Sequence, residues 1–263
     1  MTRRDLEAKI SQLESELLEC GTEADSKKTV INGSFGKLGN KWSVLYSPSL
    51  MIQVTLTGQL SLLMLIEMIE IAGISVVSAN TDGVVIDCPG CRTEELNNII
   101  RAWEIITGFN TEEAIYKALY LKDVNNYIAI KPYGKAKVKG LYAVGGLQKN
   151  PTNSICVEAV IAHLTDGVPV EQTICGCGDI KKFCTIRQVK GGALYDVAYL
   201  GKTVRWYYAA GEGRHIEYVT NGNKVARSDG ARPIMELPET VPADLDYMWY
   251  IEEARSIISD VGA

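Results

Sequence analysis

The chain has 263 residues, enough to bury a substantial core in one large domain or in two or three small ones. The composition, with 46% hydrophobic and 22% charged residues, is that of an ordinary globular protein, and the net charge of -5 argues mildly against nucleic acid as a partner. Seven cysteines, an odd number with no export signal, favour reduced thiols in a cytoplasm over a disulfide framework.

The sequence predicts neither a signal peptide nor a membrane span. The N-terminus leads through Arg3 and Arg4 directly into further charged residues. The apolar segment 60–66 is too short to cross a bilayer and is followed by Glu67 and Glu70. We therefore expect a cytoplasmic protein with no membrane partner.

The first forty residues are predicted to form a helical hairpin. Within residues 5–20, apolar side chains recur at helical spacing at Leu6, Ile10, Leu13 and Leu17. Residues 21–26 are expected to break this helix, and a second helix is expected over 27–38, ended by Gly39-Asn40.

The next segment mixes helices with short strands. A long helix is expected over 50–72, ended by Gly73, and two runs of β-formers, 74–79 and 84–87, then flank Asn80-Thr81-Asp82-Gly83. This pattern predicts a hairpin with Asp82 at its tip. Helices are expected at 93–107 and from Thr111, before a strand at 127–130. No regular βαβ repeat is present, so the predicted fold class is α+β.

Lysines concentrate between residues 122 and 149, where the only acid is Asp123. The six are Lys122, Lys131, Lys135, Lys137, Lys139 and Lys149. Lys135, Lys137 and Lys139 alternate, so on a strand all three would project from one face. One interpretation is an edge strand that lysines protect from aggregation, and the other is a face that follows nucleic-acid phosphates.

Beyond Gly145-Gly146 the pattern changes again. We expect a helix at 154–166, a helical stretch to Phe183, and short strands that include 203–209. Asn221-Gly222 predicts a second hairpin, and residues 244–258 predict a closing helix.

Lys28, Asn32 and Phe35 would share one face of a helix, because they are four and three residues apart. A lysine can offset triphosphate charge, and an amide and an aromatic ring can test the shape of a base pair. The alternative is an amphipathic helix with a surface lysine and a core phenylalanine.

Several of these segments together resemble family B DNA polymerases. Residues 28–36 are similar to the fingers motif K-x-x-x-N-S-x-Y-G, with Gly33 and Phe35 in place of Ser and Tyr. Residues 57–59, Thr-Gly-Gln, resemble T-x-G-R/Q, and residues 80–83 resemble D-T-D-S.

The resemblance continues towards the C-terminus in the same order. Lys122 with Asn126-Tyr127 resembles the K-x-Y primer-contact segment, and Lys139-Gly140 the following Lys-Gly. Residues 205–208 and 244–251 look like the thumb ending of phage-type members. The resemblance thus covers nearly the whole chain.

The resemblance implies template-directed nucleotidyl transfer from dNTP by two metal ions. It implies helical-hairpin fingers at 1–40, the C-terminal part of the palm at 41–144 with an antiparallel sheet carrying the metal-site hairpin, and a mixed α/β thumb at 145–263. Asp82 would bind Mg²⁺, and Lys28 would contact the triphosphate, with Asn32 and Phe35 beside the nascent pair. The residues implied to contact primer-template DNA are Thr81, Lys122, Tyr127, Lys135, Lys137, Lys139 and Arg205.

Two departures from the family are evident. Asn80 replaces the first carboxylate of D-T-D-S, and neither a D-x-x-S-L-Y-P segment nor an exonuclease domain precedes the fingers motif. The charge of Asp82 alone cannot balance that of two divalent cations. Asp87 lies an odd number of residues from Asp82, so its side chain is expected to face away from the metal site. We therefore expect the isolated chain to be inactive and to need a second polypeptide, or a missing N-terminal part, that carries the other aspartate.

Two other functions remain open. One is a non-catalytic remnant that binds primer-template DNA or scaffolds a replication complex, which Asn80 favours. The other is a zinc-dependent DNA-binding module, with thiolates from Cys88, Cys91, Cys175, Cys177 and Cys184. Zinc is not expected, since these cysteines are far apart in sequence and spaced unlike a zinc ribbon. His163 and His215 are expected to be structural, and a phage-encoded chain would work in a bacterial cytoplasm.

Overall fold

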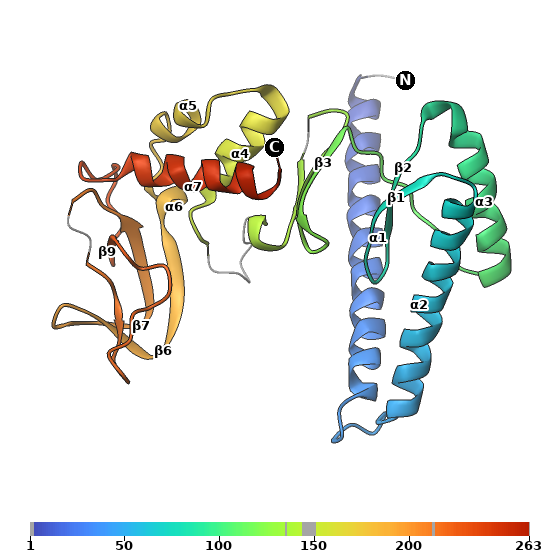
Figure 1. Cartoon of the computed structure of the whole chain (residues 1–263), viewed down its shortest axis with the longest axis horizontal. Helices are drawn as coiled ribbons and strands as arrows, with labels where there is room; N and C mark the ends of the chain where they lie inside the picture. The colour runs from blue at the N-terminus through green and yellow to red at the C-terminus, as the bar shows by residue number, and fades with distance from the viewer. Residues whose placement is uncertain (1–2, 135, 144–150, 212–213, 263) are drawn as a thin grey trace. The chain divides into compact units, whose positions relative to one another are not determined.

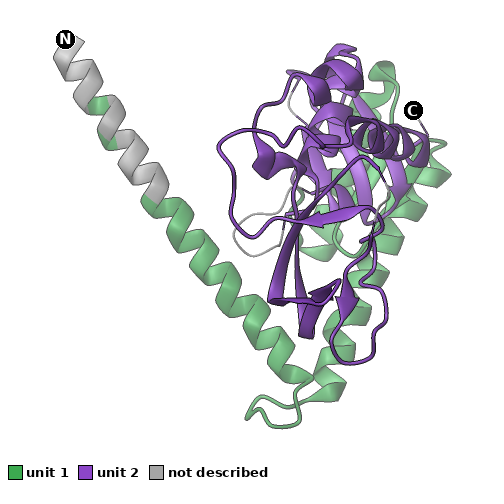
Figure 2. Cartoon of the chain, turned by 90° about the vertical axis from the view of Figure 1, so that its left-hand side faces the viewer, with its two compact units in different colours: residues 1–111 green, residues 112–263 purple. Residues whose placement is uncertain are grey.

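The computed structural model describes residues 3–134, 136–143, 151–211 and 214–262. It is 44% helix and 23% strand with antiparallel sheets, which confirms the predicted α+β class. The chain forms two compact units, unit 1 from Met1 to Thr111 and unit 2 from Glu112 to Ala263 (Figure 2). The boundary between the two units, after Thr111, lies inside the segment 41–144 that the resemblance implies to be part of the palm.

Among its described residues, unit 1 has three α-helices and one β-hairpin, which Figure 1 labels. In chain order the elements are α1 (Arg3–Leu38), α2 (Pro48–Ile71), β1 (Ser75–Ala79), β2 (Val84–Asp87), the 3₁₀ turn η1 (Gly90–Arg92) and α3 (Thr93–Thr107). The prediction of a helix at 93–107 is confirmed, and the predicted helix at 50–72 differs from α2 only at its ends.

The predicted break at residues 21–26 is wrong, because α1 is one continuous helix. A glycine inside a helix costs only about 1 kcal/mol relative to alanine, which the rest of a long helix can offset. The Ser26 and Thr29 hydroxyls donate to carbonyls one turn earlier, each at 2.8 Å, so they do not interrupt the helix. The helical hairpin of unit 1 is therefore α1 with α2, not a hairpin within residues 1–40.

The β1–β2 hairpin packs on α2 and α3 through a small core. Leu65, Ile69, Ile74 and Trp103 are buried there, and Trp103 Nε1 donates to the Ser61 carbonyl of α2 at 2.7 Å. Gly73 ends α2 with a φ of 74°. This arrangement fixes the base of the predicted hairpin on two helices.

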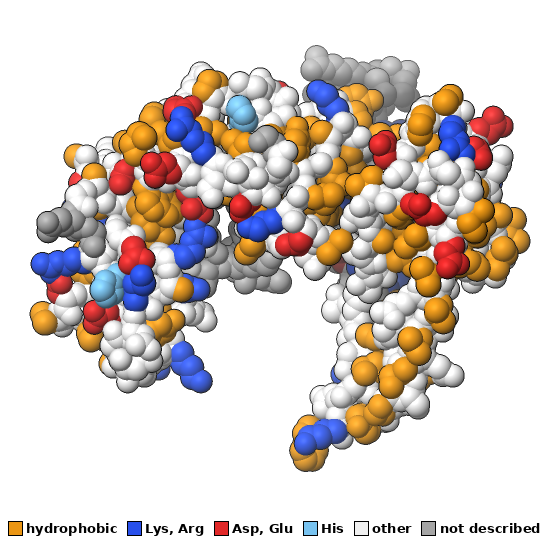
Figure 3. All heavy atoms as spheres, viewed as in Figure 1, with side chains coloured by type: hydrophobic (Ala, Val, Ile, Leu, Met, Phe, Trp, Pro, Cys, Tyr) orange, Lys and Arg blue, Asp and Glu red, His pale blue; other side chains and the backbone are white. Residues whose placement is uncertain are grey.

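The opposite face of α2 is apolar and open to solvent. Ile52, Leu56, Leu60 and Leu63 are between 47% and 62% exposed, and Figure 3 shows hydrophobic side chains along this helix. By length and composition alone, α2 is long and apolar enough to cross a membrane. One such helix is weak evidence for a span, and the expectation that there is none stays a prediction.

The helix predicted from Thr111 is wrong, because residues 108–116 form neither helix nor strand. Thr111 donates both its backbone N–H and its hydroxyl to Glu104 Oε1, at 2.7 and 2.8 Å. These two bonds lower the pKa of Glu104. A side chain of α3 thus holds the segment that would have begun the next helix.

Unit 2 combines two antiparallel sheets with four helices among its described residues. Its elements are β3 (Ala118–Asp123), β4 (Asn126–Ile130), β5 (Ala136–Lys139), η2 (Gly140–Tyr142), α4 (Ser154–Asp166), α5 (Val170–Cys175), α6 (Ile180–Phe183), β6 (Thr185–Tyr195), β7 (Ala198–Tyr208), β8 (Glu217–Tyr218), β9 (Ala231–Pro233) and α7 (Tyr247–Asp260). The sheet orders are β3-β4-β5 and β8-β6-β7-β9. The predicted helix at 154–166 and strand at 127–130 are confirmed, and the closing helix begins three residues later than predicted.

Tyr250 joins the two C-terminal segments of the resemblance in the core of unit 2. Its hydroxyl accepts the Tyr208 N–H at 3.0 Å and donates to the Phe183 carbonyl at 2.8 Å. The Tyr208 ring stacks on Trp249, with centroids 3.4 Å apart. Tyr207 also donates its hydroxyl to Asp244, at 2.9 Å. Segments 205–208 and 244–251 are therefore neighbours in space.

Replacing Tyr250 with phenylalanine is expected to lower the free energy of unfolding by about 1–3 kcal/mol, because it leaves two buried backbone groups unpaired. Urea unfolding measures the change. Tyr133→Phe, at a side chain that is 95% exposed, is the matched control and is expected to stay within about 0.5 kcal/mol of the wild type. Equal stability of the two variants would contradict the role given to the Tyr250 hydroxyl.

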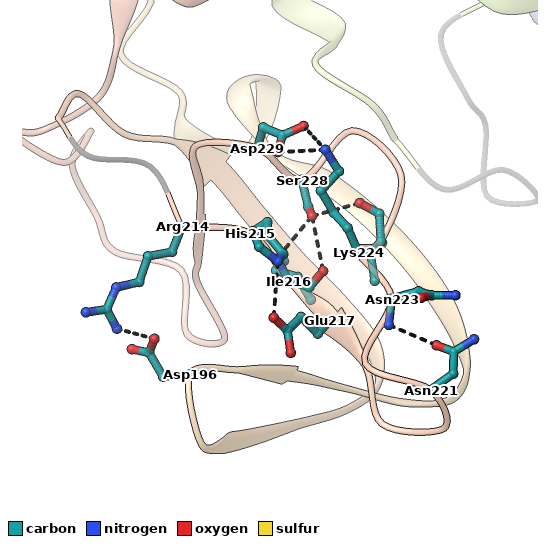
Figure 4. A network of polar contacts seen from close by, with 11 residues as sticks. Asp196, Arg214, His215, Ile216, Glu217, Asn221, Asn223, Lys224, Ser228 and Asp229 are labelled. Atoms are coloured by element: carbon teal, nitrogen blue, oxygen red, sulfur yellow. Dashed lines mark hydrogen bonds and ion pairs between the residues drawn. The ribbon is translucent and has the colours of Figure 1, made fainter.

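The predicted turn at Asn221-Gly222 is present, in a loop held by polar contacts (Figure 4). Gly222 has a φ of 67°, and the returning chain pairs through Val225 N–H to the Ile216 carbonyl at 2.7 Å. The buried Ser228 hydroxyl accepts the Ile216 N–H at 3.0 Å and donates to the Val225 carbonyl at 2.7 Å. The strand before the turn, β8, pairs with β6 as well.

Candidate functional site

The tip of the β1–β2 hairpin is shaped by Asn80. The Asn80 N–H donates to the Gly83 carbonyl at 2.9 Å, and the Asn80 side-chain oxygen accepts the Asp82 N–H at 3.2 Å. This is an Asx turn, a role for Asn80 that the comparison with D-T-D-S did not suggest. Thr81 and Asp82 are exposed, so the Asp82 carboxylate projects into solvent.

Among the tip residues 80–83, Asp82 has the only carboxylate. Asp87 pairs with Ser75 at the opposite end of the hairpin, as expected for a residue that does not share the site. Mg²⁺ prefers carboxylate oxygen, so Asp82 has suitable chemistry for one ligand. Within the described part of the chain, no three or more His, Cys, Asp or Glu side chains gather as a metal site would require.

Lys28, Asn32 and Phe35 lie on α1 and are exposed. Phe35 is 40% exposed, so the alternative of a core phenylalanine is wrong. Their spacing on a continuous helix gives them a common face, as predicted. In the described structure this face is open to a ligand.

Tyr127 and Lys139 are direct cross-strand partners on β4 and β5. The Lys139 Nζ lies 5.9 Å from the centroid of the Tyr127 ring, a cation–π contact. Lys137 and Lys139 are exposed, while Ala136 and Val138, which alternate with them along β5, pack on the core. The prediction of a common lysine face is confirmed for these two residues, and Lys135 and Lys149 lie outside the described residues.

Lys122 differs from the other predicted DNA contacts, because its ammonium is paired with Asp260 at the end of α7. This hydrogen bond raises the pKa of Lys122. The two residues are 138 positions apart, so no local pattern could have indicated the pair. Part of the Lys122 charge is therefore balanced within the protein.

Asp123 organises the turn that positions Tyr127 and Lys139. Its Oδ1 accepts the N–H groups of Asn125 and Asn126 at 2.8 and 3.0 Å, and both carboxylate oxygens accept the Asn126 amide. Asn126 Oδ1 in turn accepts the Leu141 N–H at 2.7 Å, which ties the β3–β4 turn to η2. In the sequence Asp123 stands out only as an acid among lysines, and no local pattern indicates this role.

The stability contributed by Asp123 is expected to depend on pH. Bonds from the Asn126 side chain and the Asn125 N–H lower the pKa of Asp123. The contribution is therefore present above the pKa of the unfolded chain, about 3.9, and is lost as the pH falls through the folded value. Urea unfolding of wild type and Asp123→Asn between pH 3 and 7 should give a difference that shrinks at the acid end. A difference that stays constant with pH would contradict this assignment.

The remaining candidates are distributed over both units. Arg205 is half-buried on β7, opposite Ile186. All seven cysteines are free, with Cys88 and Cys91 in unit 1 and Cys175, Cys177 and Cys184 in unit 2. Burial raises the pKa of the Cys184 thiol to about 11, which disfavours the thiolate that zinc needs. The two histidines have local partners: the Val168 carbonyl for His163 and Glu217 for His215.

The candidate site therefore has two parts. Unit 1 carries the exposed Asp82 and the α1 face with Lys28, and unit 2 carries the Tyr127–Lys139 pair with Lys137. Comparison with known proteins adds no assignment, since no model of a protein family and no curated protein matches the chain.

Proposed function

We propose that the chain is the C-terminal polymerase portion of a split or truncated phage-like family B DNA polymerase. In this assignment α1 belongs to the fingers, the β1–β2 hairpin and the β3–β4–β5 sheet to the palm, and the segment from α4 to α7 to the thumb. The reaction is template-directed nucleotidyl transfer from dNTP to a primer.

The observation that carries the proposal is the exposed Asp82 on a hairpin held by two helices. A carboxylate at the hairpin tip, free of hydrogen bonds and ion pairs to the described residues, is available to a cation. Mg²⁺ bound there would stabilise the attacking and leaving oxygens of the transfer.

The other residues have roles that follow from their chemistry. Lys28 offsets the negative charge of the triphosphate, and Asn32 and Phe35 contact the nascent base pair from the same helical face. Tyr127, Lys137 and Lys139 hold the primer and its duplex through backbone contacts, which require no fixed sequence. Lys122 keeps Asp260 as its partner and serves mainly to join β3 to α7.

A second polypeptide or segment is part of the proposal, for an electrostatic reason. Two divalent cations at one site carry four positive charges, and Asp82 supplies one negative charge. A further carboxylate must therefore approach the hairpin tip for both ions to bind, and its source is another polypeptide or segment.

The test is primer extension on a primed template with Mg²⁺, using the chain alone and together with the polypeptide encoded immediately upstream. Extension is expected only with both polypeptides, and EDTA is expected to abolish it. Extension by neither arrangement, although the chain is folded by circular dichroism, would contradict the proposal.

A second candidate is a non-catalytic remnant that binds primer-template DNA or scaffolds a replication complex. The observation that favours it is the neutral Asn80 at the tip, which leaves a single carboxylate. Under this alternative the chain binds DNA in a salt-dependent manner and gives no extension with any partner. The same primed template, labelled for binding measurements, distinguishes the two functions.

A further inference from the structure

The connection between α1 and α2 is basic and has no acid. Between Asp25 and Glu67 the sequence contains four lysines and neither Asp nor Glu. Two of these lysines, Lys37 and Lys41, lie beside the turn from one helix to the next, are exposed, and form no ion pair with any residue that the structure describes. In a chain with a net charge of -5, this segment is therefore locally positive.

Large apolar side chains around these lysines are exposed as well. Trp42 is 85% exposed and Val44 is fully exposed, and the Lys41 Nζ lies 5.1 Å from the centroid of the Trp42 ring. Six further side chains are between 45% and 54% exposed: Leu45, Tyr46, Leu50, Ile52, Val54 and Leu56. Figure 1 shows the loop at the end of α2 that lies away from the β1–β2 hairpin. The name α1–α2 end is used below for residues 37–56.

The loop of the α1–α2 end pairs several of its backbone donors internally. The Asn40 side-chain oxygen accepts the Trp42 N–H, and the Ser43 hydroxyl accepts the Leu45 N–H, each at 3.0 Å. The N–H groups of Ser43 and Tyr46 donate to carbonyls within the same loop, at 2.9 and 3.1 Å. Unpaired backbone groups are costly where water is excluded, so these bonds prepare the loop for an apolar environment.

We propose that the α1–α2 end binds the surface of a membrane that contains anionic lipids. Lysines attract the anionic headgroups, and Trp and Tyr side chains favour the boundary between headgroups and acyl chains. The aliphatic side chains of α2 enter the apolar side of that boundary. The proposal goes beyond nucleotidyl transfer, since it uses none of Lys28, Asn32 and Phe35, and it replaces the expectation that there is no membrane partner.

The packing of α2 favours binding at the surface over a span. Leu65 and Ile69 are buried in the core of unit 1, and Trp103 Nε1 holds the Ser61 carbonyl, so the C-terminal part of α2 stays in the protein. The remaining residues 48–60 form about 20 Å of helix at 1.5 Å per residue. The hydrocarbon core is roughly 30 Å thick, so this part enters one leaflet only.

Charge also favours lipid over a protein as the occupant. The centre of a protein interface is depleted in lysine, whereas Lys41 lies directly over the most exposed aromatic side chain of the loop. A second copy of the chain would bring two basic segments without acids against each other, and like charges across an interface are unfavourable. Anionic headgroups complement both the charge and the apolar side chains.

The experiment measures flotation of the full chain with vesicles of phosphatidylcholine, with and without one-third phosphatidylglycerol. Binding is expected with the anionic vesicles, is expected to be much weaker without phosphatidylglycerol, and is expected to weaken as NaCl is raised. Trp42 is the most exposed of the four tryptophans, the others being buried or half-buried. Tryptophan emission should therefore shift to shorter wavelength on binding, and this shift should be lost in Trp42→Phe.

Two substitutions at exposed positions test the two contributions separately. Trp42→Ala is expected to lower vesicle affinity by about tenfold or more, because it removes the largest apolar side chain of the loop. Lys41→Gln is expected to lower it by about fivefold. The matched controls in unit 2 are Tyr133→Ala, at a side chain that is 95% exposed, and Lys202→Gln, at an exposed lysine. Both controls are expected to keep the wild-type affinity.

Absence of binding to the anionic vesicles at low salt, or losses for the controls equal to those for Trp42→Ala and Lys41→Gln, would overturn the proposal. A shift of Trp42 emission that depends on protein concentration and needs no vesicles would assign the α1–α2 end to a second copy, and would overturn it too. Flotation uses neither DNA nor dNTP, so its failure is distinguishable from failure of primer extension.

Discussion

Replacing Asp82 with alanine is expected to lower primer extension by the chain and its partner polypeptide by about 10²–10³-fold or more. The reason is that the substitution removes the one carboxylate at the hairpin tip, and with it the ligand proposed for Mg²⁺. Initial rates of single-nucleotide addition at saturating dNTP measure the loss. DNA affinity should change little, since the duplex contacts lie on other residues.

Two further substitutions make this result specific. Asp87→Ala, at the opposite end of the same hairpin, is expected to leave the rate nearly unchanged. Asp82→Asn retains the shape of the side chain and the backbone turn at Asn80, and is expected to be as inactive as Asp82→Ala. Rates near that of the wild type for both Asp82 variants would contradict the assignment of Asp82 as a metal ligand. A loss of rate for Asp87→Ala as large as that for Asp82→Ala would indicate that the substitutions act by disturbing the structure of the hairpin.

Replacing Gly140 with alanine is expected to lower the free energy of unfolding by about 3 kcal/mol and to weaken DNA binding together with it. Gly140 has a φ of 73°, a conformation that side chains disfavour. A Cβ there would overlap Asn126 Oδ1 and the Asn125 carbonyl oxygen, so the turn organised by Asp123 must move. That turn holds Tyr127 and Lys139 in register, which links stability to binding.

Gly178→Ala is the matched control in the same unit. Its Cβ would meet no atom within 4 Å, and its backbone is not left-handed, so stability and DNA affinity are expected to match the wild type. Urea unfolding and duplex anisotropy on the same preparations give both readouts. A stable Gly140→Ala protein with normal affinity would contradict the proposed dependence of the DNA face on this turn.

The parts of the fold that the sequence predicted well are those with local start and stop residues. Helix α3 begins at Thr93 after η1 and ends before Gly108, and α4 begins at Ser154 and ends before Gly167, both glycines being left-handed. The predicted break at Gly21 failed because the cost of one glycine is small within a 36-residue helix. The predicted helix from Thr111 failed because a bond to Glu104 on another element overrides local propensity.

For the candidate site, too, the sequence predicted the features that depend on local patterns and missed those that depend on contacts between distant residues. The exposure of Asp82 and the common face of Lys137 and Lys139 follow from a turn and from strand alternation, which are local patterns. The Lys122–Asp260 pair joins residues far apart in sequence, and the bond from Asn126 to Leu141 depends on strand packing. Such contacts require the tertiary structure, and they decide which lysines keep their charge free.

The exposed face of α2 has a practical consequence for any preparation of this chain. Exposed leucine and isoleucine side chains along about three turns of α2 form a surface that favours self-association. A net charge of -5 provides only modest repulsion between molecules. Light scattering should therefore rise with protein concentration, and more steeply in sulfate than in chloride, because sulfate strengthens apolar association. Dilute solutions of low sulfate content are the conditions under which its binding and unfolding are best measured.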